Sequence, residues 1–113
     1  MLVEGQVHGG IAQGLGQVLL ERTVYDDEGQ LLAGSYMDYA MPRASDIPPM
    51  RFASQPDPAK TNPLGAKGCG EAGTSGSMPA VMNAVLDVLK RERGITDFDM
   101  PATPERVWSA LRA

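Results

Sequence analysis

The stretch "GAKGCGEAGTSGSMPAVMNAV", Gly65–Val85, places a single carboxylate, that of Glu71, in a run of small residues just before an apolar helical pattern. Glycine, alanine and serine beside Glu71 would leave room for a bulky ligand to approach the carboxylate. If a substrate reaches it, Glu71 is a candidate general base. If none does, Glu71 is a solvated loop residue, and these residues alone leave both interpretations open.

Two helices are predicted after this loop. Ser77 has the residue type of an N-cap, and Pro79 would fall in the first turn that follows it. The next segment is apolar nearly all round, which predicts a buried helix that ends at Gly94. Near the end of the sequence, Thr103 predicts a second N-cap, with Pro104 at the first helical position. The apolar positions of the first helix are Val81, Met82, Val85, Leu86, Val88 and Leu89.

The N-terminal segment "LVEGQVHGGIAQGLGQVLLE" predicts another helix, because its apolar residues recur every three or four positions. Gln6, Gln13 and Gln17 share a different face, and glycines flank them. One interpretation is a solvated glutamine face. The other is that the glycines let a ligand or another backbone approach closely. We favour close approach, because contact with solvent does not require glycine.

The middle of the chain contains candidate strands. Val24-Tyr25 and Leu31-Leu32 bracket an acidic turn with a glycine, which predicts a hairpin. A further strand is predicted over 35–41 and a short one around Phe52, followed by a long irregular loop of functional character over 55–76. The predicted fold class is therefore α+β, with about three helices and a short antiparallel hairpin or sheet.

Composition narrows the possible functions. The 113 residues carry a net charge of −4 and are 42% hydrophobic, which suits one globular domain and argues against nucleic acid as a partner. No apolar run is long enough to span a membrane, and no signal peptide is visible. The single cysteine, Cys69, excludes a disulfide framework and a zinc or iron–sulfur site. A reducing, cytoplasmic location is expected.

Other candidate groups are weaker than Glu71. His8 is the only histidine, so we interpret it as a polar helix residue rather than a metal ligand. Asp26-Asp27-Glu28 fits a solvated turn better than a calcium loop. Cys69 is interpreted as a small residue chosen for fit, because the sequence assigns no base to a nucleophile there. The glycine loop lacks the spacing of a nucleotide-binding P-loop, although its amides and the following helix N-terminus could hold an anion.

Three motifs together resemble a known family. "EGQVHGGIAQGLGQVLLE", "KGCGEAGTSGSMPAVMNAV" and "MPATPERVW" follow one another as they do at the C-terminal end of the molybdopterin-binding large subunit of the xanthine dehydrogenase, aldehyde oxidase and carbon monoxide dehydrogenase family. The resemblance extends over nearly the whole chain. It implies that residues 1–113 are the C-terminal segment of a molybdopterin-binding domain, and therefore a partial domain of a larger subunit.

The resemblance also assigns roles to residues. It implies that Glu71, in the "GCGE" loop, is the active-site base beside molybdenum. Gln6 resembles the residue that contacts the pterin, and Gln13, on the same helical face, is a weaker candidate for cofactor binding. No side chain of this chain is expected to ligate the metal. The implied cofactor is molybdopterin, with the cytosine dinucleotide form expected.

The implied activity is that of a molybdenum hydroxylase, which hydroxylates an aldehyde, an N-heterocycle or carbon monoxide with oxygen from water. Electrons would pass to iron–sulfur and FAD subunits. The family's large subunit is several times longer than this chain, so we expect a fragment that needs the remainder of that subunit and is inactive and free of cofactor alone. The competing hypothesis is a non-catalytic interaction or assembly module derived from the same family.

Overall fold

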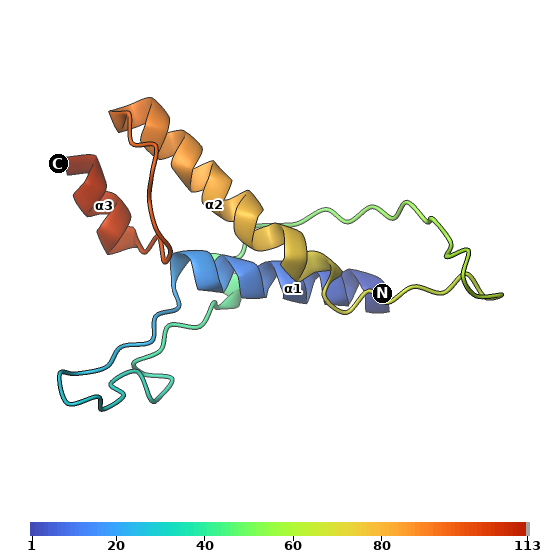
Figure 1. The fold of residues 1–113 in the computed structure, drawn as a ribbon, viewed down its shortest axis with the longest axis horizontal. Helices are drawn as coiled ribbons and strands as arrows, with labels where there is room; N and C mark the ends of the chain where they lie inside the picture. The colour runs from blue at the N-terminus through green and yellow to red at the C-terminus, as the bar shows by residue number, and fades with distance from the viewer. Residues whose placement is uncertain (113) are drawn as a thin grey trace.

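The fold consists of helices joined by long irregular segments. The computed structural model describes residues 1–112, and in that part of the chain it contains three α-helices, one 3-10 helix and no strand (Figure 1). Helices α1 and α2 cross each other, and α3 lies beside the C-terminal half of α2. The elements are α1 (Leu2–Leu19), η1 (Ala44–Asp46), α2 (Ala72–Arg93) and α3 (Pro104–Arg112).

The predicted α+β class is wrong, because the hairpin does not extend into strands. Within residues 1–112 a single antiparallel bridge joins Tyr25 and Leu31, next to a hydrogen bond from Leu32 N to Val24 O of 2.8 Å. The turn itself is well formed, since the Asp26 carboxylate accepts two backbone N–H groups within it. Strand pairs need an apolar layer to pack on, but the Tyr25 side chain is 60% exposed. The described chain is therefore all-helical.

The strands predicted over 35–41 and around Phe52 are also absent from the described chain. Residues 35–41 form a turn in which Tyr39 N donates to Ser35 O over 2.8 Å. The Tyr39 hydroxyl donates a 2.8 Å hydrogen bond to the Glu21 carboxylate, which ties this segment to the end of α1. That hydrogen bond raises the pKa of Tyr39, because it stabilises the protonated hydroxyl.

Helix α2 begins earlier than the sequence predicts. Glu71 occupies its N-cap position and Ala72 is its first residue, so the N-cap predicted at Ser77 is wrong. Ser77 instead lies inside the helix and is buried, and its hydroxyl donates to Gly10 O over 3.3 Å. Glycine and serine, the residue types at positions 73 and 77, are typical of loops. In α2 they lie four residues apart, on the face that meets α1.

Glycines at the crossing allow α1 and α2 to pack backbone against backbone. A Cβ on Gly10 would lie 2.6 Å from a backbone nitrogen of α2, and one on Gly14 would lie 2.8 Å from Ser77 Cβ. From the other side, a Cβ on Gly73 would lie 2.9 Å from Val7 Cα. Real Cβ atoms do not approach so closely, so these positions require glycine. The sequence predicts that a ligand or another backbone approaches the glycines of α1. At Gly10 and Gly14 the backbone that approaches is that of α2.

The core is small and lies near the C-terminal end of α1. Val18 and Leu89 are fully buried, and Ala102 N donates a 2.6 Å hydrogen bond to Val18 O. The α2 segment predicted to be buried contributes only Leu89 to this core, and half of the Val88 side chain is exposed. Helix α2 therefore carries more apolar side chains than the described chain buries.

The predicted C-terminal end of α2 and the predicted start of α3 are confirmed. Gly94 terminates α2 with φ of 69°, a left-handed conformation that glycine adopts without strain. Its backbone N–H donates to the carbonyls of the last turn. Helix α3 starts at Pro104, and the Thr103 hydroxyl oxygen accepts a 3.4 Å hydrogen bond from Arg106 N. Arg106 also donates through its guanidinium to Pro101 O over 2.7 Å, which holds α3 to the preceding segment.

Candidate functional site

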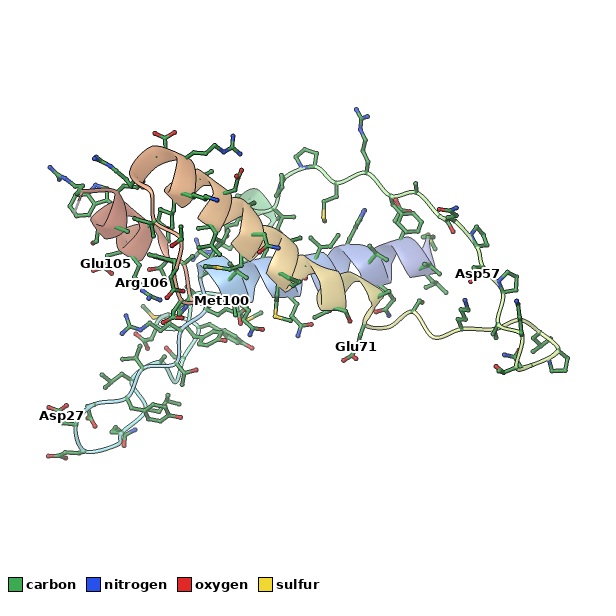
Figure 2. The ribbon with its side chains drawn as sticks, turned by 45° about the horizontal axis from the view of Figure 1, so that its top comes forward. Asp27, Asp57, Glu71, Met100, Glu105 and Arg106 are labelled. Carbon is green, nitrogen blue, oxygen red and sulfur yellow. The ribbon has the colours of Figure 1, made fainter. Side chains whose placement is uncertain are left out.

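Glu71 projects into open space at the start of α2. Figure 2 shows its carboxylate pointing away from both crossing helices. The residue is exposed, and within residues 1–112 it forms no side-chain hydrogen bond or ion pair. Gly68 and Gly70, which precede it, have no atom within 4 Å of a Cβ position. The carboxylate is therefore accessible to a large ligand, as the small flanking residues predict.

The helix crossing brings Gln6 and Glu71 to the same end of the molecule. Gly73, two residues after Glu71, packs on Val7, the residue after Gln6. Gln13 lies two helical turns farther along α1, about 10 Å from Gln6 along the axis. Both glutamines are exposed, and no hydrogen bond joins either of them to Glu71 in the described chain. The geometry thus associates Gln6 with Glu71 more closely than it does Gln13.

The surroundings of these residues fit a flat polar group that carries phosphate, such as molybdopterin. Gly5 and Gly9, which flank Gln6, have no atom within 4 Å of a Cβ position, so this part of α1 is open to a ligand. Within residues 1–112 no side chain caps the N-terminus of α2, so the positive end of the helix dipole remains for an anion, although Ala72 N already donates to Cys69 O over 3.2 Å. The Nε2 atom of His8 is buried without a hydrogen-bond partner in the described chain.

The His8 nitrogen was missed by the sequence interpretation, which treated His8 as an ordinary polar helix residue. A lone histidine gives no signal of an unpaired buried nitrogen, because the signal arises only from packing. A buried polar atom without a partner is costly, and nothing in the described chain explains this one.

The remaining candidates support no alternative site. No group of three or more metal-ligating side chains occurs among residues 1–112. The lysine of the glycine loop, Lys67, pairs with Asp57 over 3.2 Å. Asp26 uses its carboxylate inside its own turn, and Cys69 is half-buried. None of the described helices has the length and apolarity needed to cross a bilayer.

We expect Gln6→Ala to weaken cofactor retention in a complete large subunit while leaving its stability nearly unchanged. Gln6 is exposed and bonded to nothing in the described chain, so the change in unfolding free energy should stay within about 0.5 kcal/mol. Pterin and molybdenum content per subunit, measured beside thermal unfolding, checks this expectation. Gln17→Ala is the matched control, since Gln17 is an exposed glutamine three turns farther along α1. Normal cofactor content combined with early melting would make Gln6 a structural residue.

Comparisons with known proteins identify a family to which the chain is similar. A family model described as a molybdopterin cofactor-binding domain matches residues 1–48. The chain is 37% identical to the carbon monoxide dehydrogenase large chain of Hydrogenophaga pseudoflava, in an alignment that covers 99% of this chain and 14% of that protein. It is 39% identical to the nicotine 6-hydroxylase large subunit of Paenarthrobacter nicotinovorans, in an alignment that covers 98% of this chain and 14% of that protein.

The fold has a counterpart in solved structures. Quinoline 2-oxidoreductase from Pseudomonas putida 86 matches with a TM-score of 0.88 and 42% identity over 99% of this chain. The match covers 14% of that chain, so the 113 residues span only a small part of the relatives' length. The chain belongs to the molybdopterin-binding large-subunit family of the xanthine and carbon monoxide dehydrogenases, of which it represents a segment.

Proposed function

We propose that this chain supplies the active-site base and pterin contacts of a molybdenum hydroxylase. The observation that carries the proposal is the position of Glu71, whose unpaired carboxylate lies open at the end of the helix pair that also presents Gln6. Residues 1–113 would form the C-terminal segment of a molybdopterin-binding domain. Gln6 would donate a hydrogen bond to the pterin, and Gln13 is a weaker candidate for the same role.

The proposed reaction hydroxylates an aldehyde, an N-heterocycle or carbon monoxide with water as the oxygen source. For a C–H substrate, one C–H bond breaks, one C–O bond forms, and two protons and two electrons leave. The cofactor, when bound, would supply the redox chemistry that takes up those electrons. Glu71 would accept the proton released when the water-derived oxygen becomes a nucleophile, which is the role of a general base.

The proposal includes partners. The two electrons need an exit, which iron–sulfur and FAD subunits would provide, since the described chain has no cluster of ligands for iron. The bacterial relatives and separately named large subunits favour the cytosine dinucleotide form of the cofactor. A cytoplasmic location is part of the same proposal.

The proposed function is tested with the complete large subunit, assembled with its partners and loaded with cofactor. Turnover is measured against quinoline, nicotine, aldehydes and carbon monoxide with an artificial electron acceptor, in water enriched in oxygen-18. Label in the hydroxylated product would support the proposal. If the fully metallated assembly oxidises none of these substrate classes, the chain is better described as a non-catalytic assembly module.

We expect the chain purified alone to contain no stoichiometric molybdenum and to show no hydroxylase activity. The groups that fit the cofactor lie at one open end of two helices, and nothing in the described chain encloses that end. Elemental analysis of the purified protein checks this expectation. About one molybdenum atom per chain would contradict it.

A further inference from the structure

The backbone of Glu71 occupies the third position of a tight turn. Ala72 N donates a 3.2 Å hydrogen bond to Cys69 O, and Glu71 itself has φ of −110° and ψ of 10°. These angles are close to those of the third residue of a type I turn, about −90° and 0°. The turn sets the direction of the Cα–Cβ bond, so every rotamer of the Glu71 side chain starts from the position that the turn gives to Cβ.

The glycines before Glu71 add little rigidity to this turn. Gly68 and Gly70 have no atom within 4 Å of a Cβ position, and glycine leaves the backbone more conformational freedom than other residues do. The Glu71 side chain adds none either, because it makes no hydrogen bond or ion pair within residues 1–112. The position of the carboxylate therefore depends on the contacts that the first turn of α2 makes with the Glu71 backbone.

Ser75, one helical turn after Glu71, makes two of these contacts. Its backbone N–H donates to Glu71 O over 3.1 Å, and its hydroxyl donates to the same oxygen over 3.2 Å. Any residue except proline could form the backbone bond, whereas the second bond requires a hydroxyl. No other side chain of the described residues forms a hydrogen bond to residues 69–72. The Ser75 side chain is also exposed, so its hydroxyl contributes through this bond and not through core packing.

We propose that Ser75 is a positioning residue, whose hydroxyl holds the Glu71 backbone where the Glu71 carboxylate can accept a proton. The inference rests on the proposed function, and it adds to that function a residue that acts through Glu71 without touching the substrate. Without the hydroxyl, the carboxylate keeps its chemistry but its backbone is free to shift. A displacement of about 1 Å at a catalytic group can cost about 100-fold in rate, so a smaller shift should cost about 10-fold.

Three substitutions of Ser75 separate the effect of the hydroxyl from the effect of side-chain shape. Ser75→Ala removes the hydroxyl. Ser75→Thr and Ser75→Val have nearly the same shape, but only threonine can donate to the carbonyl four residues earlier. Ser109→Ala is the matched control, since Ser109 is an exposed serine in α3. Turnover and KM are measured per molybdenum in the complete, cofactor-loaded enzyme, and hydrogen exchange of the Ala72 and Ser75 amides is measured in the same subunit produced without molybdenum.

Ser75→Ala and Ser75→Val should lower kcat by about 10-fold while KM and molybdenum content stay unchanged. Ser75→Thr and Ser109→Ala should retain the turnover of the unaltered enzyme. The Ala72 and Ser75 amides should exchange faster in Ser75→Val than in Ser75→Thr, because the turn opens more often when the hydroxyl bond is absent. Equal exchange in these two variants would overturn the proposal, and so would full turnover in Ser75→Val.

The Glu71→Gln background shows whether Ser75 acts through Glu71. Positioning matters only for a group that takes up the proton, so adding Ser75→Ala to Glu71→Gln should lower the residual turnover no further. An equal loss in both backgrounds would make Ser75 a structural residue and overturn its positioning role, while the proposed function would stand. Full turnover of Glu71→Gln alone would instead refute the catalytic role of Glu71, and the role of Ser75 with it.

Discussion

Glu71→Gln in the complete, metallated enzyme should lower turnover by about 10²–10⁴-fold, the usual contribution of proton transfer by a placed side chain. Glutamine keeps the shape of the side chain and one acceptor oxygen but cannot take up a proton at neutral pH. Fold and molybdenum content should be nearly unchanged, because the Glu71 side chain makes no hydrogen bond or ion pair within residues 1–112. Steady-state turnover, normalised to molybdenum content, is the measurement.

Asp27→Asn is the matched control for Glu71→Gln. Asp27 is an exposed carboxylate at the tip of the hairpin turn, far from the start of α2 in Figure 2. Its replacement removes the same charge and should leave turnover unchanged. Turnover of Glu71→Gln within roughly twofold of the unaltered enzyme would show that Glu71 is a solvated residue without a catalytic role. For such a residue the expected change in unfolding free energy is within about 0.5 kcal/mol.

The sequence predicts elements that depend on local chemistry. The α1 periodicity, the glycine that ends α2 and the threonine–proline start of α3 are all visible in short stretches, and the structure confirms each of them. The exposure of Glu71 was predictable for a similar reason, because a lone glutamate among small residues is a local pattern. The catalytic assignment of Glu71 remains a proposal that the experiment above tests.

Features that depend on packing could not be predicted in the same way. The hairpin has suitable residues and a suitable turn, but strands form only where a layer covers them, and within residues 1–112 the Tyr25 side chain stays 60% exposed. The start of α2 was placed too late because Gly73 and Ser77 were interpreted as loop and N-cap residues. A signal was present nonetheless: Gly10 and Gly14 on α1, and Gly73 and Ser77 on α2, are small residues four apart, the spacing of a close helix crossing.

Gly73→Ala should destabilise the assembled protein by about 1–3 kcal/mol, the usual cost of overpacking. The new Cβ would lie 2.9 Å from Val7 Cα and 3.0 Å from Val7 C, and both are backbone atoms of α1 that cannot rotate away. The helices must therefore move apart at their crossing. Glu71 lies two residues before the clash, so turnover should fall as well, because a displacement of about 1 Å at a catalytic group can cost about 100-fold. Denaturant unfolding and turnover per molybdenum measure the two effects.

Gly76→Ala is the control that separates this clash from the general effect of replacing glycine in a helix. Gly76 lies in the same helix, three residues later, and no atom lies within 4 Å of its Cβ position. Alanine there should stabilise α2 by up to about 1 kcal/mol, because it lowers the entropy cost of the helical backbone. Equal unfolding free energies for the two variants would mean that the α1–α2 crossing is looser than described. Loss of turnover in Gly73→Ala alone, with cofactor retained, would show that the crossing is what places Glu71, and hence that the small residues of both helices serve catalysis through packing.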